Sequence, residues 1–310
     1  MKLRLGTRAS DLARIQSESV ARSLDEAGFA AELTFIRTAG DRSKAASFGS
    51  IGPQGVFVRE IEQALLAGTI DLAVHSFKDL PTRSPPELTI AAVPERADAA
   101  DVLIVKDMAL DRNAGSPLPL VERARVGTAS ARRRVWLEHF RPDLVVESLR
   151  GNVPTRIRRL REQRYDAIVL AAAGVERLRN STDVLDPLLD GLAILRLDPE
   201  QFVPAPAQGA LAVQCRKVDT EVAAALGALD DSPCRVAVST ERAALARAEG
   251  GCDIAFGAYC RRADNGFDLI AMLERNGQVR TSRVAGSDAA ALADRAWTEL
   301  ATSPEDHAQT

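Results

Sequence analysis

The stretch that decides the fold is VFVREIEQALLAGTIDLAVHSFKDLP, residues 56–81. Its first half carries apolar residues at helical spacing, namely Val58, Ile61 and Leu65. That half ends at Gly68, a residue type that commonly terminates helices. The second half opens with a short apolar run that ends in polar residues, which is typical of a buried strand. A helix followed at once by a buried strand is the repeating element of α/β proteins.

The same alternation of strand and helix extends outward from this stretch. It predicts strands at residues 2–7, 31–39 and 88–94 and a helix at 11–28. A second alternating set begins near residue 100, after a polar, turn-rich segment. It predicts strands at 101–105, 124–128, 144–151 and 166–174, a helix from Ser130 and another helix at 153–163.

The C-terminal third departs from this alternation. Residues 197–209 contain three prolines, which is typical of a crossing or hinge segment. From about residue 226 the pattern predicts a helix at 239–251, a pair of strands and a final helix at 288–301. We therefore predict two α/β domains joined by hinge segments, and a small third domain of mixed type. Two α/β domains joined in this way usually bind a ligand between them, at the carboxyl ends of their strands.

Composition narrows the class of protein. The chain has 310 residues, 46% hydrophobic and 27% charged, an ordinary balance for a globular protein of two or three domains. Its net charge of −3 argues against a surface devoted to nucleic acid. The N-terminus lacks the apolar core of a signal peptide, and no apolar window is long enough to span a membrane. We therefore expect a cytoplasmic protein.

The chain has four cysteines, at positions 215, 234, 252 and 260. In a reducing compartment we expect no disulfides, and the cysteine spacing, far from every histidine, argues against a metal site. Cys215 and Cys234 are expected to be small buried apolar side chains. Cys252 follows two glycines in EGGCDIAFGAYC. The residues alone leave four roles open for it: a disulfide, a metal ligand, a buried filler or a covalent attachment point.

Arginine is concentrated between positions 122 and 164. Twelve arginines stand there against five acids and no lysine, a local charge of +7. Arginine without lysine favours two-pronged recognition of carboxylate or phosphate. Arg132 and Arg133 open a predicted helix whose first N–H groups attract an anion. Arg150 ends a strand and Arg156 lies in the first turn of the next helix. Together with Arg132 and Arg133, these two arginines could line the opening of one binding site. The arginines expected to face solvent are Arg158, Arg159, Arg161 and Arg164.

Polar side chains also follow two strands of the first domain. VHSFKDLP ends in Ser76, Lys78 and Asp79, and GTRAS offers Arg8 and Ser10. Lys78 and Asp79 are either an ion pair at the rim or a carboxylate set in a cationic cleft. In a cleft, the carboxylate could stabilise a substrate cation and transfer protons.

Eight motifs then occur in one order along the chain: GTRAS, AGDR, VHSFKDLP, VGTASARR, RGNVPTR, LAAAGVERL, PAPAQGAL and ERAALARAEGGC. In this order the chain resembles the porphobilinogen deaminase (hydroxymethylbilane synthase) family over nearly its whole length. The resemblance implies two α/β lobes, like those of periplasmic binding proteins, around a cleft, and a small α+β C-terminal domain. The first lobe would comprise residues 1–96 and 203–222, the arginine-rich second lobe residues 100–198, and the third domain residues 226–310.

The resemblance implies a role for Cys252 as the thioether anchor of a dipyrromethane cofactor made from the enzyme's own substrate. The two glycines before it would let the backbone approach the cleft. Cys260 lies outside the motif and is expected to pack. The implied reaction joins four porphobilinogen molecules head to tail, releasing ammonia each time through an electrophilic azafulvene. Hydrolysis then releases hydroxymethylbilane. This activity would make the protein a transferase of porphyrin and heme biosynthesis.

The resemblance also assigns the polar residues. Asp79 matches the catalytic carboxylate, with Arg132 and Arg150 beside it in the catalytic set. The residues implied to hold the cofactor are Cys252, Lys78, Asp79, Ser130, Arg132 and Arg133. Those implied to bind substrate carboxylates are Arg8, Ser10, Arg150, Arg156 and Arg177. The implied partner is porphobilinogen, with no nucleic acid and no membrane, and we expect a monomer.

Departures from the family pattern lie in loops. The glycine-rich stretch 47–58 fits a mobile lid better than a phosphate loop, because it lacks the phosphate-loop lysine. Gln54 stands there where relatives often carry a cation, while Asp41 matches the start of the lid. Ala129 removes a hydroxyl, and Ala207 occupies a position where glycine is frequent. These changes bear on substrate affinity rather than on the reaction.

Two other classes of protein explain less. A non-catalytic two-lobed binding protein for a dicarboxylate accounts for the arginines, but not for EGGC or the third domain. A nucleic-acid binder needs aromatic side chains on which bases stack, and the basic window offers only Trp136, Phe140 and Tyr165. An intact mass separates the enzyme from both, because only the enzyme carries a covalent dipyrromethane.

Overall fold

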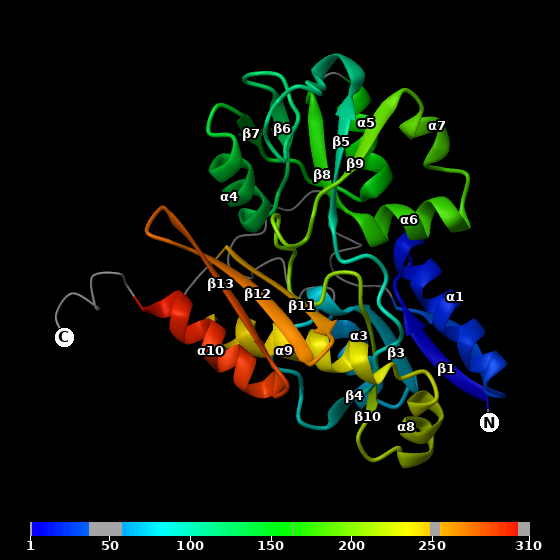
Figure 1. Ribbon diagram of the computed structural model, residues 1–310. Coiled ribbons are helices and arrows are strands. Elements are labelled where there is room, and N and C mark those ends of the chain that lie inside the picture. Colours follow the sequence, from blue (N-terminus) through cyan, green and yellow to red (C-terminus); the bar gives the residue numbers. More distant parts are fainter. Residues whose placement is uncertain (1, 37–57, 163, 249–254, 303–310) are drawn as a thin grey trace, which may run out of the picture. The chain divides into compact units, whose positions relative to one another are not determined.

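A computed structural model describes residues 2–36, 58–162, 164–248 and 255–302 (Figure 1). The chain divides into two compact units, residues 1–97 with 209–236 and residues 98–208 with 237–310. The described residues form three sheets, one in the first unit and two in the second.

The first unit is built on a five-stranded sheet in the order β2-β1-β3-β10-β4. Its strands are β1 (Lys2–Thr7), β2 (Ala30–Phe35), β3 (Leu72–Ser76), β4 (Leu88–Ala92) and β10 (Leu211–Arg216). β1 is parallel to β2 and β3, whereas β10 is antiparallel to β3 and β4. The predicted α/β pattern is confirmed, and β10 inserts a late segment of the chain into the early sheet.

Glycines end the helices of the first unit where the sequence predicts. α1 (Asp11–Glu26) and α3 (Arg59–Leu66) both pack on this sheet. Gly28 and Gly68 follow them with φ of +86° and +68°. These are left-handed conformations, which residues with a Cβ disfavour. α8 (Thr220–Gly227) packs on β4 and β10.

A polar chain crosses the apolar interior of the first unit. His75 on β3 is 6% exposed, and its Nε2 lies 3.1 Å from Oε1 of Gln214 on β10. Gln214 Nε2 donates in turn to Oε1 of Glu62 on α3, at 3.1 Å. The Gln214 oxygen accepts from an imidazole that carries its proton on Nε2, so the network selects this neutral tautomer. Burial lowers the pKa of His75 to about 4, against a smaller rise from the bond to Gln214.

We expect the free energy of unfolding to fall as the pH drops from about 6.5 toward 4. His75 takes up a proton near pH 6.5 in the unfolded chain but only near pH 4 in the folded chain. Across that window the unfolded state binds more protons, so stability decreases, by roughly 3 kcal/mol at most. Urea denaturation at about pH 7 and about pH 4.5 measures the loss. His75→Gln should reduce it, and an unchanged loss in that variant would assign the pH dependence to other groups.

The second unit contains a five-stranded sheet in the order β7-β6-β8-β5-β9. Its strands are β5 (Asp101–Lys106), β6 (Arg125–Gly127), β7 (Val145–Glu147), β8 (Ala167–Ala171) and β9 (Leu192–Arg196). Its helices are α4 (Ala131–Phe140), α5 (Val153–Arg161), α6 (Ala172–Ser181) and the short α7 (Asp186–Leu189). The strand predicted to reach Gly174 ends at Ala171 instead, because its alanines favour the helix that begins at Ala172.

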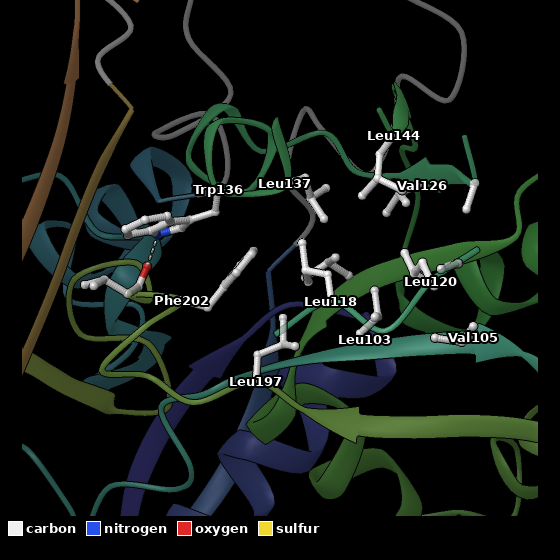
Figure 2. Close-up of a cluster of buried hydrophobic side chains, with 14 of the residues drawn as sticks. Leu103, Val105, Leu118, Leu120, Val126, Trp136, Leu137, Leu144, Leu197 and Phe202 are labelled. Carbon is white, nitrogen blue, oxygen red and sulfur yellow. Dashed lines mark hydrogen bonds between the residues drawn. The ribbon is translucent and has the colours of Figure 1, made fainter. Parts of the chain in front are cut away.

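Figure 2 shows the core that attaches α4 to this sheet. Leu103 and Val126 of the sheet share one cluster with Trp136 and Leu137 of α4 and with Phe202 of the proline-containing segment. All five are at most 2% exposed, and burying each large side chain stabilises the fold by about 1.5–3 kcal/mol. Because Trp136 lies in this core, it cannot stack on a nucleic-acid base.

The third sheet has three antiparallel strands, so the predicted strand pair is wrong by one strand. The strands are β11 (Phe256–Ala263), β12 (Gly266–Arg275) and β13 (Gln278–Gly286). A tight turn at Asn276 and Gly277, both with positive φ, joins β12 to β13, which is the usual Asn-Gly hairpin turn. Two helices complete this part, α9 (Ser232–Ala248) and α10 (Ala289–Ala301), and α10 packs along β12 and β13 (Figure 1).

Each of the three predicted domains contains one of these sheets. The second and third sheets lie in the same compact unit, because Ile270 and Met272 of β12 join the core around Leu103. The first unit resumes at residue 209 rather than at 203. The division into three domains stays a prediction.

Candidate active site

Parallel strands place their carboxyl ends at one edge of a sheet. β1 and β3 are parallel neighbours, so the residues that follow them lie at the same edge of the first unit. Arg8 and Ser10 follow β1, and Ser10 is the N-cap of α1. Lys78 and Asp79 follow β3 in a 3₁₀ turn. The first unit therefore brings together the four residues that the sequence assigned to its part of the site.

Asp79 is the exposed member of this group. The turn Phe77–Asp79 is anchored by the buried Phe77, whose N–H donates to the Ala210 carbonyl at 3.0 Å. Within the described ranges the Asp79 carboxylate makes no ion pair and no side-chain hydrogen bond, so it is not the ion-pair partner of Lys78. This negative charge is presented to solvent on a fixed turn, where a cationic group can approach it.

Two helix N-termini lie at one edge of the second unit. β6 and β7 are parallel, and each leads into a helix through a capped turn. Ser130 Oγ accepts the Arg133 N–H at 3.4 Å at the start of α4. Asn152 Oδ1 accepts the Thr155 N–H at 3.0 Å at the start of α5. The remaining N–H groups of these first turns favour an anion.

Arg132 and Arg133 are buried against one carboxylate that the sequence analysis did not identify. Asp101 is 0% exposed, and the two arginines are 4% and 6% exposed. Arg132 Nη2 donates to Asp101 Oδ2 at 2.7 Å, and Arg133 Nη2 donates to Oδ1 at 2.8 Å. Burial would raise the pKa of Asp101, but the charges and hydrogen bonds of the two arginines outweigh it and hold this pKa well below its usual range.

This buried group carries a net positive charge. Burial lowers the pKa of Arg132 more than Asp101 raises it, yet a guanidinium keeps its proton at physiological pH. Two cations therefore share one anion. Arg132 Nε is buried without a hydrogen-bond partner in the described part of the chain. An additional anionic acceptor would satisfy both the excess charge and this unpaired donor.

A second group of arginines, Arg150, Arg156 and Arg159, surrounds the N-terminus of α5. Arg156 Nε donates to the Gly151 carbonyl at 2.6 Å, and Arg159 Nη1 donates to the Arg150 carbonyl at 2.9 Å. Burial lowers the pKa of Arg156, and the charges of Arg133 and Arg159 lower it further. None of the three forms an ion pair with a carboxylate in the described ranges. Arg159, which was expected to face solvent, is half-buried beside the other two arginines.

Arg177 lies on α6, the helix that follows β8. It is half-buried, and burial lowers its pKa while Glu176 raises it. The second unit thus contains all five arginines and the one serine that the sequence assigned to it, at or near the starts of the helices that follow its parallel strands and on α6. The members are Ser130, Arg132, Arg133, Arg156 and Arg177, with Arg150 on the turn before α5.

Several predicted features lie outside the described residues: Cys252, Asp41, Gln54 and most of the glycine-rich stretch. The other cysteines behave as predicted, since Cys215, Cys234 and Cys260 are all buried thiols. Ala129 is exposed, and Ala207 is buried with a φ of +59°.

Two further findings concern the described ranges alone. No group of three or more histidine, cysteine, aspartate or glutamate side chains is placed to hold a metal ion. None of the helices there is both long and apolar enough to cross a membrane.

Sequence reasoning missed three buried polar residues of the second unit: Asp101, Gln208 and Glu241. Asp101 opens a buried apolar strand, and an acid at such a position is the signal that could have indicated a buried cation. Gln208 lies within PAPAQGAL and Glu241 within ERAALARAEGGC, the motifs already noted. Their partners are distant in sequence, so only the structure identifies them.

Arginines and helix N-termini beside the ends of parallel strands are the arrangement by which α/β proteins bind anions. Residues 3–224 match the family model described as "Porphobilinogen deaminase, dipyromethane cofactor binding domain". The chain belongs to the porphobilinogen deaminase family, whose members are transferases.

Individual relatives agree with this assignment. A porphobilinogen deaminase of Lachnospira eligens is 42% identical over 304 residues, which is 96% of this chain and 98% of the relative. One from Roseiflexus sp. (strain RS-1) is 46% identical over 257 residues, 82% of this chain and 80% of the relative. Among solved structures, an ancestral cationic amino acid solute-binding protein matches with a TM-score of 0.41 and 15% identity. This match covers 73% of this chain and 86% of that one. At that TM-score the likeness adds nothing to the assignment.

The residues of the second unit fit the dipyrromethane cofactor of this family. Each pyrrole of a dipyrromethane carries carboxylate side chains, so the group is a polyanion. The unpaired Arg132 Nε, the excess charge around Asp101 and the capped start of α4 at Ser130 supply the matching donors. The chemistry of the donor set therefore agrees with the family.

Proposed function

We propose that this protein is a hydroxymethylbilane synthase that extends a dipyrromethane attached to Cys252. In each step the aminomethyl carbon of one porphobilinogen forms a C–C bond to the free α-carbon of the preceding pyrrole. Ammonia leaves from the aminomethyl carbon, and the α-carbon that attacks it then loses its proton. After four such steps, water cleaves the product from the cofactor as hydroxymethylbilane. The attached group supplies the pyrrole on which the chain grows.

One observation supports this function above the others. The side chains of Arg156 and Arg159 lie close together, Arg159 contacts the backbone of the exposed Arg150, and none of the three has a carboxylate partner in the described ranges. Arginines elsewhere in the unit, such as Arg125 and Arg141, pair with acids. Clustered cations cost free energy unless an anion joins them. A growing chain of pyrroles, each with two carboxylates, is a ligand that would neutralise all three.

The residues of the chain take distinct roles in this proposal. Asp79 holds a negative charge beside the pyrrole that becomes cationic and accepts its proton. Lys78, Ser130, Arg132 and Arg133 bind carboxylates of the cofactor. The residues proposed for substrate carboxylates are Arg8, Ser10, Arg150, Arg156 and Arg177. Because every role falls within one chain, we propose a monomer that works in the cytoplasm on a small-molecule substrate.

Intact mass spectrometry tests the proposal. The purified chain should be heavier than its sequence by one dipyrromethane, and peptide mapping should place the group on Cys252. Cys252→Ala should remove the added mass and leave a folded protein. An unmodified Cys252 in freshly prepared active protein would contradict the proposal.

We expect the arginines of α5 to differ by position rather than by charge. Arg156→Leu should lower kcat/KM by about tenfold or more, because it removes a contact to a substrate carboxylate. Arg156→Lys should restore activity only in part, since an ammonium cannot form a two-pronged contact.

Arg158→Leu is the matched control, since Arg158 lies on the same helix but is exposed. It should change stability by no more than about 0.5 kcal/mol and leave kcat/KM near that of the wild type. Steady-state rates and the masses of the enzyme-bound intermediates measure both effects. Equal losses of kcat/KM in the two leucine variants would mean that the arginines act through their summed positive charge and not through individual contacts.

A further inference from the structure

The segment 202–208, here called the strap, is buried although it forms no helix or strand. Phe202, Val203, Ala207 and Gln208 are each at most 1% exposed. A buried irregular segment must satisfy its backbone polar groups through other elements. The partners of the strap therefore show what it holds in place.

On one side the strap holds the two buried arginines. The Val203 carbonyl accepts from Arg132 Nη1 at 2.7 Å and from Trp136 Nε1 at 3.1 Å, the second bond being visible in Figure 2. Gln208 Nε2 donates to Asp101 Oδ1 at 2.8 Å, the oxygen that also pairs with Arg133. A shift of the strap would therefore move the partners of both guanidinium groups.

On another side the strap lies against β11. The Pro204 carbonyl accepts the Ala258 N–H at 3.0 Å. A Cβ added to Gly257 would lie 2.9 Å from the Val203 oxygen and 3.1 Å from the Pro204 oxygen. Both are backbone atoms, so any side chain at position 257 would displace the strap.

Glu241 joins these elements through its two carboxylate oxygens. It lies on α9 and is 0% exposed. Its Oε2 accepts the Ala207 N–H of the strap at 2.6 Å, and its Oε1 accepts the Cys260 N–H of β11 at 2.7 Å. α9 ends at Ala248 and β11 begins at Phe256. Glu241 thus ties the elements before and after Cys252 in the sequence to one another and to the strap.

We propose that Glu241 is a positioning residue for attachment of the cofactor. Through the strap it fixes Arg132 and Arg133 relative to α9 and β11, the two elements that flank Cys252 in the sequence. A carboxylate suits this task because both its oxygens accept hydrogen bonds, whereas an amide would turn a donor toward one of the two N–H groups. The inference rests on the proposed function, because it concerns the rate at which the arginines and the thiol together capture the polyanion.

The test measures cofactor attachment rather than turnover. Apo protein is incubated with porphobilinogen, and intact mass follows the gain of one dipyrromethane with time. Glu241→Gln should slow this gain by about tenfold, since it removes one charge-assisted hydrogen bond and misplaces the binding groups. Gly257→Ala should slow it similarly, although it keeps the carboxylate and removes no polar group. If Glu241→Gln does not fold, the rate of attachment in Gly257→Ala decides the test.

Leu292→Ala is the control for a merely structural role. Leu292 is 0% exposed in the core between α10 and the third sheet, so its loss destabilises the same unit without touching the strap. Attachment rates are compared well below each unfolding midpoint, where Leu292→Ala should load like the wild type. If Glu241→Gln and Gly257→Ala both gained the dipyrromethane at the rate of Leu292→Ala, the inference would be overturned but the proposed function would stand. A wild-type chain that never gains the mass would overturn the proposed function, and the inference with it.

Discussion

Replacing Asp79 with asparagine is expected to lower kcat by about 10²–10⁴-fold, the usual contribution of a general acid–base group. The amide keeps the size of the side chain but carries no charge and accepts no proton from the cationic pyrrole. The dipyrromethane should stay attached, because the arginines and Cys252 are unchanged. Steady-state kinetics and intact mass on one preparation measure the two effects separately. Asp79 is exposed, so stability should change by no more than about 0.5 kcal/mol.

Asp107→Asn is a matched control for this variant. Asp107 is also an exposed aspartate in a 3₁₀ turn directly after a strand. It follows β5, which is antiparallel to β8, so it lies at the sheet edge opposite the N-termini of α4 and α5. Its replacement should leave kcat unchanged. Near-normal turnover in Asp79→Asn would remove Asp79 from the catalytic set.

Replacing Asp101 with asparagine should have the largest effect on stability. The substitution leaves the buried Arg132 and Arg133 without their counter-charge, and breaking a buried ion pair in this way costs about 3–5 kcal/mol. Urea denaturation followed by circular dichroism should therefore show the second unit unfolding at lower urea concentration. The loss of stability should persist at high salt concentration, because solvent ions do not screen a buried ion pair well.

Asp186→Asn provides the comparison. Asp186 also pairs with an arginine, Arg179 at 3.1 Å, but this pair is on the surface, with side chains 49% and 60% exposed. Its loss should cost no more than about 1 kcal/mol. If the two variants were equally stable, the buried group around Asp101 would contribute no more than a surface pair.

Local sequence signals predicted most elements of the fold. The helix ends at Gly28 and Gly68 and the helix starts at Ser130 and Val153 depend on residues next to them in the chain. The place of β10 between β3 and β4 depends instead on which strand edges are apolar and unpaired, which no local pattern specifies. The third strand of the C-terminal sheet was missed for a different reason, because the Asn276–Gly277 hairpin turn between β12 and β13 is a local signal that was not used.

The residues of the candidate site also fall into two groups, those that local sequence signals identify and those that they do not. Arginines at helix starts and Asp79 at a strand end can be identified from sequence, since helix N-termini and strand ends are local features. The partner of Arg132 and Arg133 could not be, because Asp101 lies 31 and 32 residues away from them in the chain. The bond between Glu241 and Ala207 spans 34 residues and is equally hidden.

The late insertion of β10 has a consequence for biosynthesis on the ribosome. β4 pairs only with β10 within the described chain, and β10 ends at Arg216. The sheet that contains β1 therefore cannot close until more than two thirds of the chain has been translated, whereas the sheet of β5 to β9 has all its strands by Arg196. A nascent chain arrested between these two points would have a complete sheet in the second unit but an unpaired edge of β3 in the first. Such edges recruit chaperones or aggregate, so expression yield should depend on how promptly β10 leaves the exit tunnel.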